Sequence, residues 1–492
     1  MQPAAATGKP WSDRILTEPD PRRWLGLVVL LIGAFLSSFD FFVVNVALPA
    51  LHDELGARAA DQQLVVAGFG LALAVLIVTG GRLGDLYGRK RLFMIGMAGF
   101  TLASALCGFA ATPRALIASR VLQGLTAALM SPQVLAIIRV TFAENERARA
   151  IGYFGSTIGL ASIAAQLIGG ALIELNIFGL GWRPIFLVNL PVGVVALLMA
   201  RSMLSESRAS GRPSLDFGGI AIGSVALLLL VYPLVEGREA GWPAWAIWAL
   251  LASVPAFAAF VWWEWLVQGR GRAPLVNLRL FRDPAFSLGL VMTVTFFGGL
   301  SAFFLSLTVY LQQGFGYSPL ATGLVFVAFG AGFVLGSSFS ARIVRRIGPR
   351  AISLGTALMG SGLLGIIALA LTAHGAPVNN WLLAPVLVWY GVGQGFALPT
   401  LAGAVVGSSR VPPQDAGSAS GMFSMVQQVA FALGVAAIAG VFFSQLGGAA
   451  DGRAYQWALS VTLACNVALM ATTCVLAFFL PRAAVARTVH VE

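Results

Sequence analysis

Long apolar stretches alternate with short charged loops along almost the whole chain. A helix needs roughly 20 consecutive apolar residues to cross a bilayer core about 30 Å thick. Fourteen stretches approach or exceed that length, and the first holds a single ionisable residue. The pattern predicts an all-α membrane protein with spans near 24–50, 63–82, 92–111, 115–140, 149–173, 184–204, 216–235, 243–266, 285–312, 320–344, 351–373, 380–407, 417–446 and 456–480.

Composition and charge placement agree with this prediction and orient the chain. Of the 492 residues, 58% are hydrophobic and 10% charged, which is far from a soluble domain. With the N-terminus inside, cytoplasmic segments hold 25 of the 31 Lys and Arg residues and outer loops hold 5. Cytoplasmic loops are enriched in these residues, so we expect both termini in the cytoplasm of a multi-pass cell-membrane protein. The net charge of +11 then reflects topology and attraction to lipid rather than a nucleic-acid partner.

The chain repeats itself. Arg82 and Gly88 have counterparts 260 residues later, and the pair Gln123-Gly124 has one 271 residues later. Two similar offsets predict two homologous six-helix halves, a plan in which the substrate site lies between the halves. We therefore expect an N-terminal segment (1–23), a first bundle (24–204), a linker with two extra helices (205–283), a second bundle (284–480) and a tail (481–492).

Two ionisable residues lie well inside the spans, Asp40 in the first and Arg120 in the fourth. A charge inside a bilayer is costly and is a functional candidate by default. Both residues fall in the outer half of the membrane, at depths where they could meet. Burial disfavours the charged carboxylate and a nearby arginine favours it, so changing proximity would let Asp40 take up and release a proton. The alternative is a static ion pair that only fixes packing.

The segment after the second span, residues 81–91, is called the gate loop here. Gly81 and Gly88 permit a tight turn, and Asp85 can pair with a helix N-terminus or with Arg89. Such a pair, with Lys90 in the same basic cluster, could latch the cytoplasmic side in one state and release it in another.

The second half has no acidic residue within its spans. Apolar walls with a few neutral polar groups suit a lipophilic, neutral or weakly charged ligand. The alternative for each polar group is that it only pairs helices. Candidate cavity residues in both halves are Asn45, Gln123, Gln166, Asn189, Gln312, Gln313, Tyr390, Gln394, Gln427 and Gln428.

Other chemistry has little support in the sequence. The three cysteines and three histidines show no metal-ligand spacing, so we expect neither metal nor cofactor. Neither Lys9 nor Lys90 lies in a phosphate-binding loop, so the energy source is expected to be an ion gradient. Glu264, between Trp263 and Trp265, is expected to reach the headgroups from an interfacial aromatic belt.

Several motifs together resemble a known family. The gate loop, with Gly81, Gly84, Asp85, Gly88, Arg89 and Lys90, is similar to the signature loop of the major facilitator superfamily. Residues 36–49, 120–124, 181–193 and 415–421 resemble segments of its fourteen-span drug:proton antiporters, the EmrB/QacA type. The match covers nearly the whole chain.

The resemblance implies a major facilitator fold arranged as 6 + 2 + 6 helices, with Asp40 and Arg120 in proton transfer. It implies an exporter of lipophilic small molecules (drugs, antibiotics or a secondary metabolite) rather than an enzyme. We expect the protein to be a monomer. Protonation of Asp40 from outside would break its pairing and favour the inward-facing state.

The fifth span departs from the antiporter pattern. Antiporters usually carry Gly-Pro there, whereas this chain has Ala165-Gln166. The alternative of a proton-coupled symporter importing a small metabolite therefore stays open. The remaining small residues are expected to allow close helix packing, namely Gly155, Gly159, Gly169 and Gly170.

Overall fold

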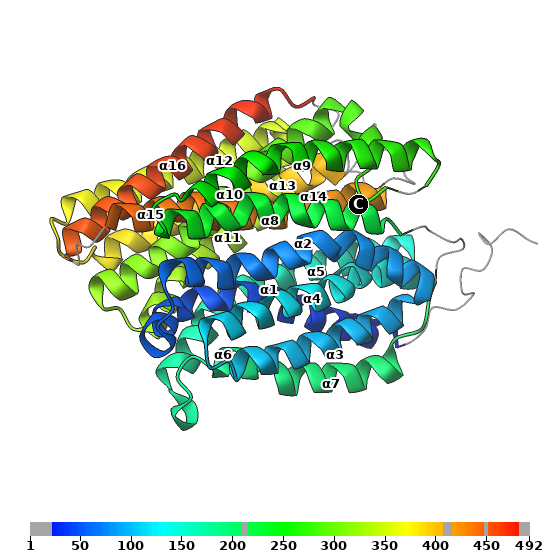
Figure 1. Ribbon diagram of the computed structural model, residues 1–492, viewed down its shortest axis with the longest axis horizontal. Coiled ribbons are helices and arrows are strands. Elements are labelled where there is room, and N and C mark those ends of the chain that lie inside the picture. Colours follow the sequence, from blue (N-terminus) through cyan, green and yellow to red (C-terminus); the bar gives the residue numbers. More distant parts are fainter. Residues whose placement is uncertain (1–21, 209–214, 273, 407–415, 447–450, 482–492) are drawn as a thin grey trace, which may run out of the picture.

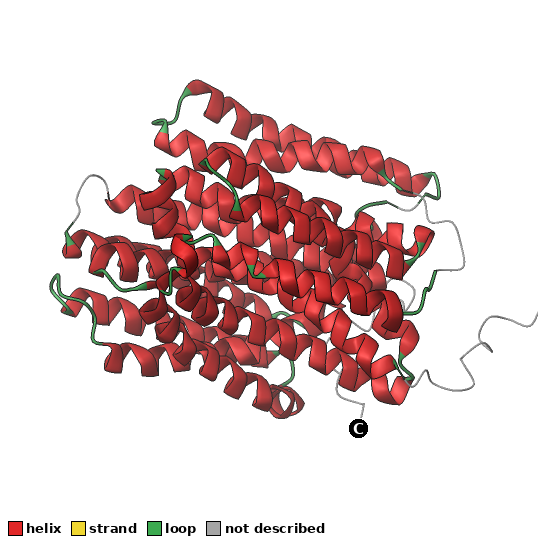
Figure 2. Cartoon of the chain, turned by 90° about the horizontal axis from the view of Figure 1, so that it is seen from below, coloured by secondary structure: helices red, strands yellow, loops and turns green. Residues whose placement is uncertain are grey.

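The computed structural model describes residues 22–208, 215–272, 274–406, 416–446 and 451–481, and these are almost entirely helical (Figure 2). Within these residues, fourteen helical spans are long and apolar enough to cross a membrane, which confirms the predicted number. Most of the expected N-terminal segment and tail, as well as Asp415 of one motif, lie outside the described residues.

The first six spans form one bundle, at the blue and cyan end of the colour scale in Figure 1. They are α1 (Arg23–Leu55), α2 (Ala59–Tyr87), α3 (Arg89–Gly108), α4 (Pro113–Thr141), α5 (Glu144–Glu174) and, as one interrupted span, α6 (Pro184–Leu187) with α7 (Asn189–Met203). A short 3-10 turn, η2 (Ile177–Gly179), precedes α6. Helices are expected here because a segment in lipid must satisfy its own backbone hydrogen bonds.

The last six spans form the second bundle. Two of them continue through a π-helical turn, so that α10 (Pro284–Val309) runs into η4 (Tyr310–Gly314) and α14 (Ala416–Leu433) runs through η6 (Gly434–Ile438) into α15 (Ala439–Leu446). The others are α11 (Pro319–Ile347), α12 (Arg350–Thr372), α13 (Asn380–Val406) and α16 (Gly452–Phe478). The two bundles meet where α2 packs against α14 and where α5 packs against α11.

The two extra spans, α8 (Phe217–Glu239) and α9 (Ala244–Gly269), pair with each other and lie against α2 through α8 (Figure 1). At the end where α2 begins, Arg58 forms salt bridges to Glu236 (3.1 Å) and Glu239 (3.3 Å). Nearby, the guanidinium of Arg238 donates to the Gly440 carbonyl at 2.5 Å. The extra helices therefore contact both bundles. A short 3-10 helix, η3 (Leu278–Arg282), leads from them into α10.

The outer face of α9 is apolar and aromatic. Trp262 and Trp265 are 60% and 63% exposed, but Glu264 between them is fully buried. The expectation that Glu264 reaches the headgroups is therefore wrong, because this residue faces α8 and the following linker while the two tryptophans face outward.

The gate loop is mostly helical. Gly81 and Asp85 belong to α2, α3 begins at Arg89, and Gly88 alone forms the turn, with a φ of 111°. Its counterpart in the second bundle, Gly348, has a φ of 60°. Residues with a side chain rarely adopt positive φ, so the backbone conformation explains why glycine occupies this position in both halves.

Glycines let α2 and α4 approach closely. A Cβ at Gly80 would lie 2.0 Å from the Ala128 carbonyl oxygen, and one at Gly124 would lie 2.3 Å from that of Phe69. Because both obstacles are backbone atoms, neither can move aside without separating the helices.

We expect Gly80→Ala to destabilise the protein by roughly 1–3 kcal/mol, because the added methyl group overpacks this contact. The matched control is Gly152→Ala, where a Cβ meets no heavy atom within 4 Å. That change should be neutral or stabilising, since alanine favours helix. Thermal unfolding midpoints of the purified variants in detergent test this. Equal midpoints would show that the α2–α4 contact is not tight.

Candidate functional site

The structure brings Asp40 and Arg120 together in the middle of the first bundle. Both side chains are fully buried, and the Arg120 guanidinium forms an ion pair with Asp40 Oδ2. Because the surroundings exclude water, the two charges depend on each other and on their hydrogen-bond partners.

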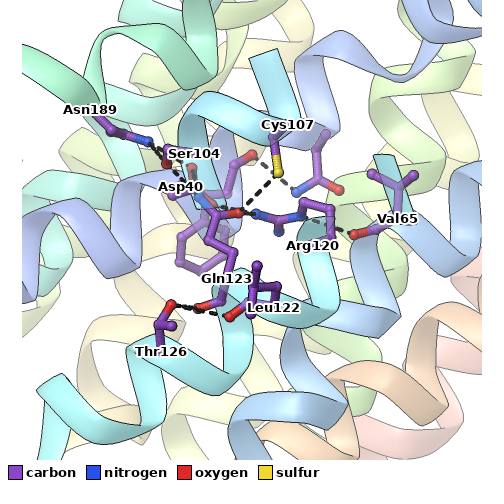
Figure 3. A network of polar contacts seen from close by, with 11 residues as sticks. Asp40, Val65, Ser104, Cys107, Arg120, Leu122, Gln123, Thr126 and Asn189 are labelled. Atoms are coloured by element: carbon purple, nitrogen blue, oxygen red, sulfur yellow. Dashed lines mark hydrogen bonds and ion pairs between the residues drawn. The ribbon is translucent and has the colours of Figure 1, made fainter. Parts of the chain in front are cut away.

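Three further polar side chains surround Asp40 (Figure 3). Gln123 Nε2 and Asn189 Nδ2 donate to Asp40 Oδ1 at 2.9 and 2.8 Å. Both amides also donate to Ser104 Oγ, at 2.6 and 3.0 Å. The carboxylate thus receives hydrogen bonds from α4 and α7, and Ser104 of α3 orients the two donors.

Arg120 also connects the pair to α2. Its Nε donates to the Val65 carbonyl at 3.1 Å, and one terminal nitrogen donates to Gln123 Oε1 at 2.6 Å. The guanidinium carbon lies 4.4 Å from the centroid of the Phe69 ring, within cation–π range. Phe69 therefore contacts the ion pair on one face.

A cavity of about 230 Å³ lies between the two bundles. It is lined from α1, α2, α4 and α5 of the first bundle and α10, α11, α13 and α14 of the second. Nine of its 26 lining residues are phenylalanines: Phe41, Phe42, Phe69, Phe154, Phe297, Phe304, Phe329, Phe333 and Phe431. Phe69 thus borders both the cavity and the ion pair.

Three of the ten candidate cavity residues line this space, namely Gln394, Gln427 and Gln428. The amide oxygens of Gln394 and Gln428 are buried and have no hydrogen-bond partner in the structure. A ligand in the cavity could satisfy both oxygens with hydroxyl, amine or ammonium donors.

The other seven candidates lie outside the lining. Gln123 and Asn189 belong to the Asp40 network. Three more candidates donate to backbone carbonyls of α1. The side-chain amides of Asn45 (3.1 Å) and Gln166 (3.2 Å) donate to the Phe42 carbonyl, and that of Gln312 donates to the Val46 carbonyl (3.1 Å). The Tyr390 ring packs 4.5 Å from that of Phe303, and Gln313 is half-buried.

One end of the cavity is closed by an aromatic floor that joins the two bundles, formed by Phe41, Phe42, Phe304 and Phe431. The Phe41 and Phe431 ring centroids are 4.8 Å apart, and those of Phe42 and Phe304 are 5.5 Å apart. Beyond the floor, the α1 carbonyls described above accept from α5 and from η4.

Beyond the aromatic floor, contacts between the end of α5 and the start of α11 also close this side of the cavity. Leu320 N donates to Glu174 Oε2 at 3.2 Å, which links the end of α5 to the start of α11. A Cβ at Gly170 would lie 2.4 Å from the Pro319 carbonyl oxygen. The cavity therefore lies toward the other end of the bundles, where α1 begins and α2 ends, which is called the basic-loop end here.

The remaining glycines of α5 differ in their surroundings. A Cβ would lie 2.4 Å from Val43 at Gly169 and 2.8 Å from Phe333 at Gly159, but at Gly155 it would meet nothing within 4 Å. Gly155 and Gly159 line the cavity, and the open space there explains why Gly155 has no close neighbour.

At the basic-loop end, the gate loop ties the first bundle together. The Arg89 guanidinium donates to Asp85 Oδ1 at 2.8 Å. Lys90 Nζ donates to the carbonyls of Arg201 (2.8 Å) and Leu204 (2.6 Å) at the end of α7. A Cβ at Gly81 would be in ordinary contact with Pro132 of α4, at 3.6 Å.

Sequence reasoning missed Ser104 and the aromatic floor. A lone serine in an apolar span carries no signal, because many such hydroxyls bond the preceding helical turn. The adjacent pair Phe41-Phe42 beside Asp40 was visible, but its partners Phe304 and Phe431 are more than 260 residues away.

Comparisons with known proteins agree with this geometry. Residues 30–435 match the family model described as the Major Facilitator Superfamily. The chain is 39% identical over 441 residues to a probable actinorhodin transporter of Streptomyces coelicolor, covering 89% of this chain and 76% of that one. It is 35% identical over 427 residues to a puromycin resistance protein of Streptomyces alboniger, covering 85% and 81%. A tetracenomycin C resistance and export protein of Streptomyces glaucescens is 33% identical over 433 residues, covering 87% and 77%.

Solved structures share the fold. A POT family transporter in complex with a thioalcohol-conjugated peptide superposes with a TM-score of 0.66 at 15% identity, covering 92% of this chain and 96% of that chain. Another POT family transporter, in complex with 5-aminolevulinic acid, gives 0.64 at 14% identity, covering 93% and 95%. On its family match and its curated relatives, the chain belongs to the major facilitator superfamily and is a multi-pass membrane transporter rather than an enzyme.

Proposed function

We propose that this protein exports lipophilic small molecules, antibiotics among them, in exchange for protons. The observation that carries the proposal is the buried Asp40–Arg120 pair and its connection to the cavity. Phe69 contacts Arg120 and also lines the cavity, whose lining includes other phenylalanines and two amide groups with unpartnered oxygens. Relatives named for resistance and export favour export over the alternative of import.

We propose that both termini are cytoplasmic and that the chain acts as a monomer in the cell membrane, divided into bundles of six spans with two extra spans between them. The cavity is built within one chain, so no second copy is needed to complete it. With this orientation the basic-loop end faces the cytoplasm. The aromatic floor and the α5–α11 contacts would then close the outer side, which supports the assignment of an inward-facing state.

In the proposed cycle, Asp40 takes up a proton while the outer side is open. Protonation weakens its pairing with Arg120 and favours the inward-facing state. Proton release to the cytoplasm restores the ion pair, which is the arrangement observed here. A ligand shifts this equilibrium only through different affinities for the two states.

Substrate entering from the cytoplasm or inner leaflet would press on the aromatic walls. Drug-sized ligands occupy sites of roughly 300–1,000 Å³, so the phenylalanines must separate to admit one. Phe41 and Phe42 directly follow Asp40 on α1, and Phe69 contacts Arg120. Binding would therefore be transmitted to the ion pair through these three rings. The Asp85–Arg89 pair is already formed here, within the first bundle. To latch the cytoplasmic side in the outward-facing state, as the gate-loop hypothesis requires, these two residues would have to exchange this pairing for partners in the second bundle.

We expect Asp40→Asn to abolish proton-driven extrusion, because asparagine can keep hydrogen bonds to its neighbours but cannot carry a proton. The measurement is accumulation of lipophilic dyes and antibiotics in energised cells at matched expression. Wild type should lower accumulation in an uncoupler-sensitive way, and the variant should behave like cells without the protein. Asp53→Asn, at an exposed carboxylate, is the control. Uphill extrusion by Asp40→Asn equal to wild type would refute the coupling role.

We expect Gln394→Leu and Gln428→Leu each to weaken transport of substrates that bear hydrogen-bond donors by roughly two- to tenfold, the value of one lost hydrogen bond. Substrates without donors should be affected less. The readout is the apparent KM across a panel of substrates, with Gln313→Leu as the control outside the cavity lining. The same change for all three variants would rule out direct ligand contact.

Orientation can be tested by labelling single cysteines in a variant whose native cysteines at 107, 465 and 474 are replaced. A membrane-impermeant maleimide should label the Phe178→Cys variant in intact cells, since Phe178 is 94% exposed in the loop before α6. The Arg270→Cys variant, at an exposed site on the basic-loop end, should react only after permeabilisation. The reverse pattern would invert the proposed topology.

A further inference from the structure

Two carboxylates meet at the basic-loop end of the extra helices, away from the Asp40 network. Asp216 directly precedes α8, and its Oδ1 accepts from Gly219 N (2.8 Å) and Trp263 Nε1 (2.8 Å). Glu264 lies on α9, and its Oε2 accepts from Val276 N at 3.0 Å. Glu264 is fully buried and Asp216 is 7% exposed.

The second oxygen of each carboxylate is buried and has no hydrogen-bond donor. These oxygens are Asp216 Oδ2 and Glu264 Oε1. A Cβ built on Gly219 would lie 2.6 Å from the first and 2.4 Å from the second. The two oxygens therefore occupy one small space beside α8, separated by no more than the sum of these distances.

Ionising both carboxylates in such a small buried space would cost a large free energy. Burial penalises each charge, and like charges at short range penalise the pair again. Arg82 of α2 is a positive group near enough to interact electrostatically with both carboxylates. Its guanidinium donates to the Pro274 carbonyl, two residues before Val276. One arginine balances one negative charge, which is the charge of two carboxylates that hold one proton.

We propose that Asp216 and Glu264 form a second proton-binding site, in which one proton is shared between Asp216 Oδ2 and Glu264 Oε1. A hydronium ion in the solution at the basic-loop end gives up this proton and becomes water. The proton forms an O–H bond on one oxygen and a hydrogen bond to the other. The site joins α8, α9 and residues 274–276, and it lies beside the end of α2 that carries the gate loop.

A proton fits this site better than a metal ion does. Calcium takes six to eight oxygen ligands, and magnesium needs an octahedral set. No cluster of three or more His, Cys, Asp or Glu suited to a metal occurs in the described part of the chain. Arg82 would in addition repel a cation.

The sign of the pH dependence follows from the charges. At a pH below the value at which the shared proton dissociates, the pair carries one negative charge, and Arg82 balances it. When the proton dissociates at higher pH, the two negative charges repel each other. This repulsion weakens the packing of α8, α9 and the linker against α2. The extra helices thus respond to proton concentration on the same side as the gate loop.

The test is infrared difference spectroscopy of the full-length protein in lipid nanodiscs, recorded between acidic and alkaline pH. A protonated carboxylic acid gives a carbonyl stretch that shifts in heavy water. Wild type should show such a band, and both Glu264→Gln and Asp216→Asn should lose it. Asp53→Asn and Asp40→Asn should keep it, which separates this site from the exposed carboxylate and from the proposed coupling site. None of these readouts depends on transport.

The second readout is the pH dependence of the unfolding midpoint, which can also be measured for variants of lower stability. Glu264→Gln supplies an amide donor to Asp216 without a shared proton, so its unfolding midpoint should fall less than that of wild type as pH rises. A band that persists in both Glu264→Gln and Asp216→Asn would overturn the proposal. Absence of the band in wild type, together with an unfolding midpoint that rises with sodium concentration, would overturn it in favour of a cation site.

Discussion

The first bundle is organised around one buried ion pair. Asp40 and Arg120 are fully buried, so protein groups must take the place of solvating water. Gln123, Asn189 and the Val65 carbonyl do so from three different helices. Burial makes the charges of the pair costly. It also makes the pair sensitive to protonation of Asp40, because little solvent screens the resulting change of charge.

The cavity is coupled to this pair by packing rather than by polar contact. Asp40 is not exposed to the cavity, but Phe69 borders both the cavity and Arg120. The aromatic floor joins α1 to α10 and α14, so any movement that opens it must move the helix that carries Asp40. In the proposed cycle, proton and ligand would influence each other through this packing, without sharing a binding site.

The extra helices are anchored to the first bundle at both ends of α2. At one end Arg58 binds the two glutamates at the end of α8, and at the other Arg82 reaches the linker beside the Asp216–Glu264 pair. In between, α8 lies along α2 and α9 faces outward. The same α2 packs against α14 of the second bundle, so α8 and α9 lie next to one of the seams between the bundles.

The sequence by itself determined the number of spans and the two intramembrane charges, and it predicts the repeated halves. Bilayer thickness makes span length a local property, and a lone charge in an apolar run is visible without a structure. Tertiary structure alone decided which polar residues face the cavity. Gln394 and Gln428 do, whereas Gln166 and Gln312 bond to backbone carbonyls of α1. It also reversed the expectation for Glu264. A helical side chain's partner depends on the rotation of its helix against its neighbours, and that rotation is set by contacts between residues far apart in the sequence.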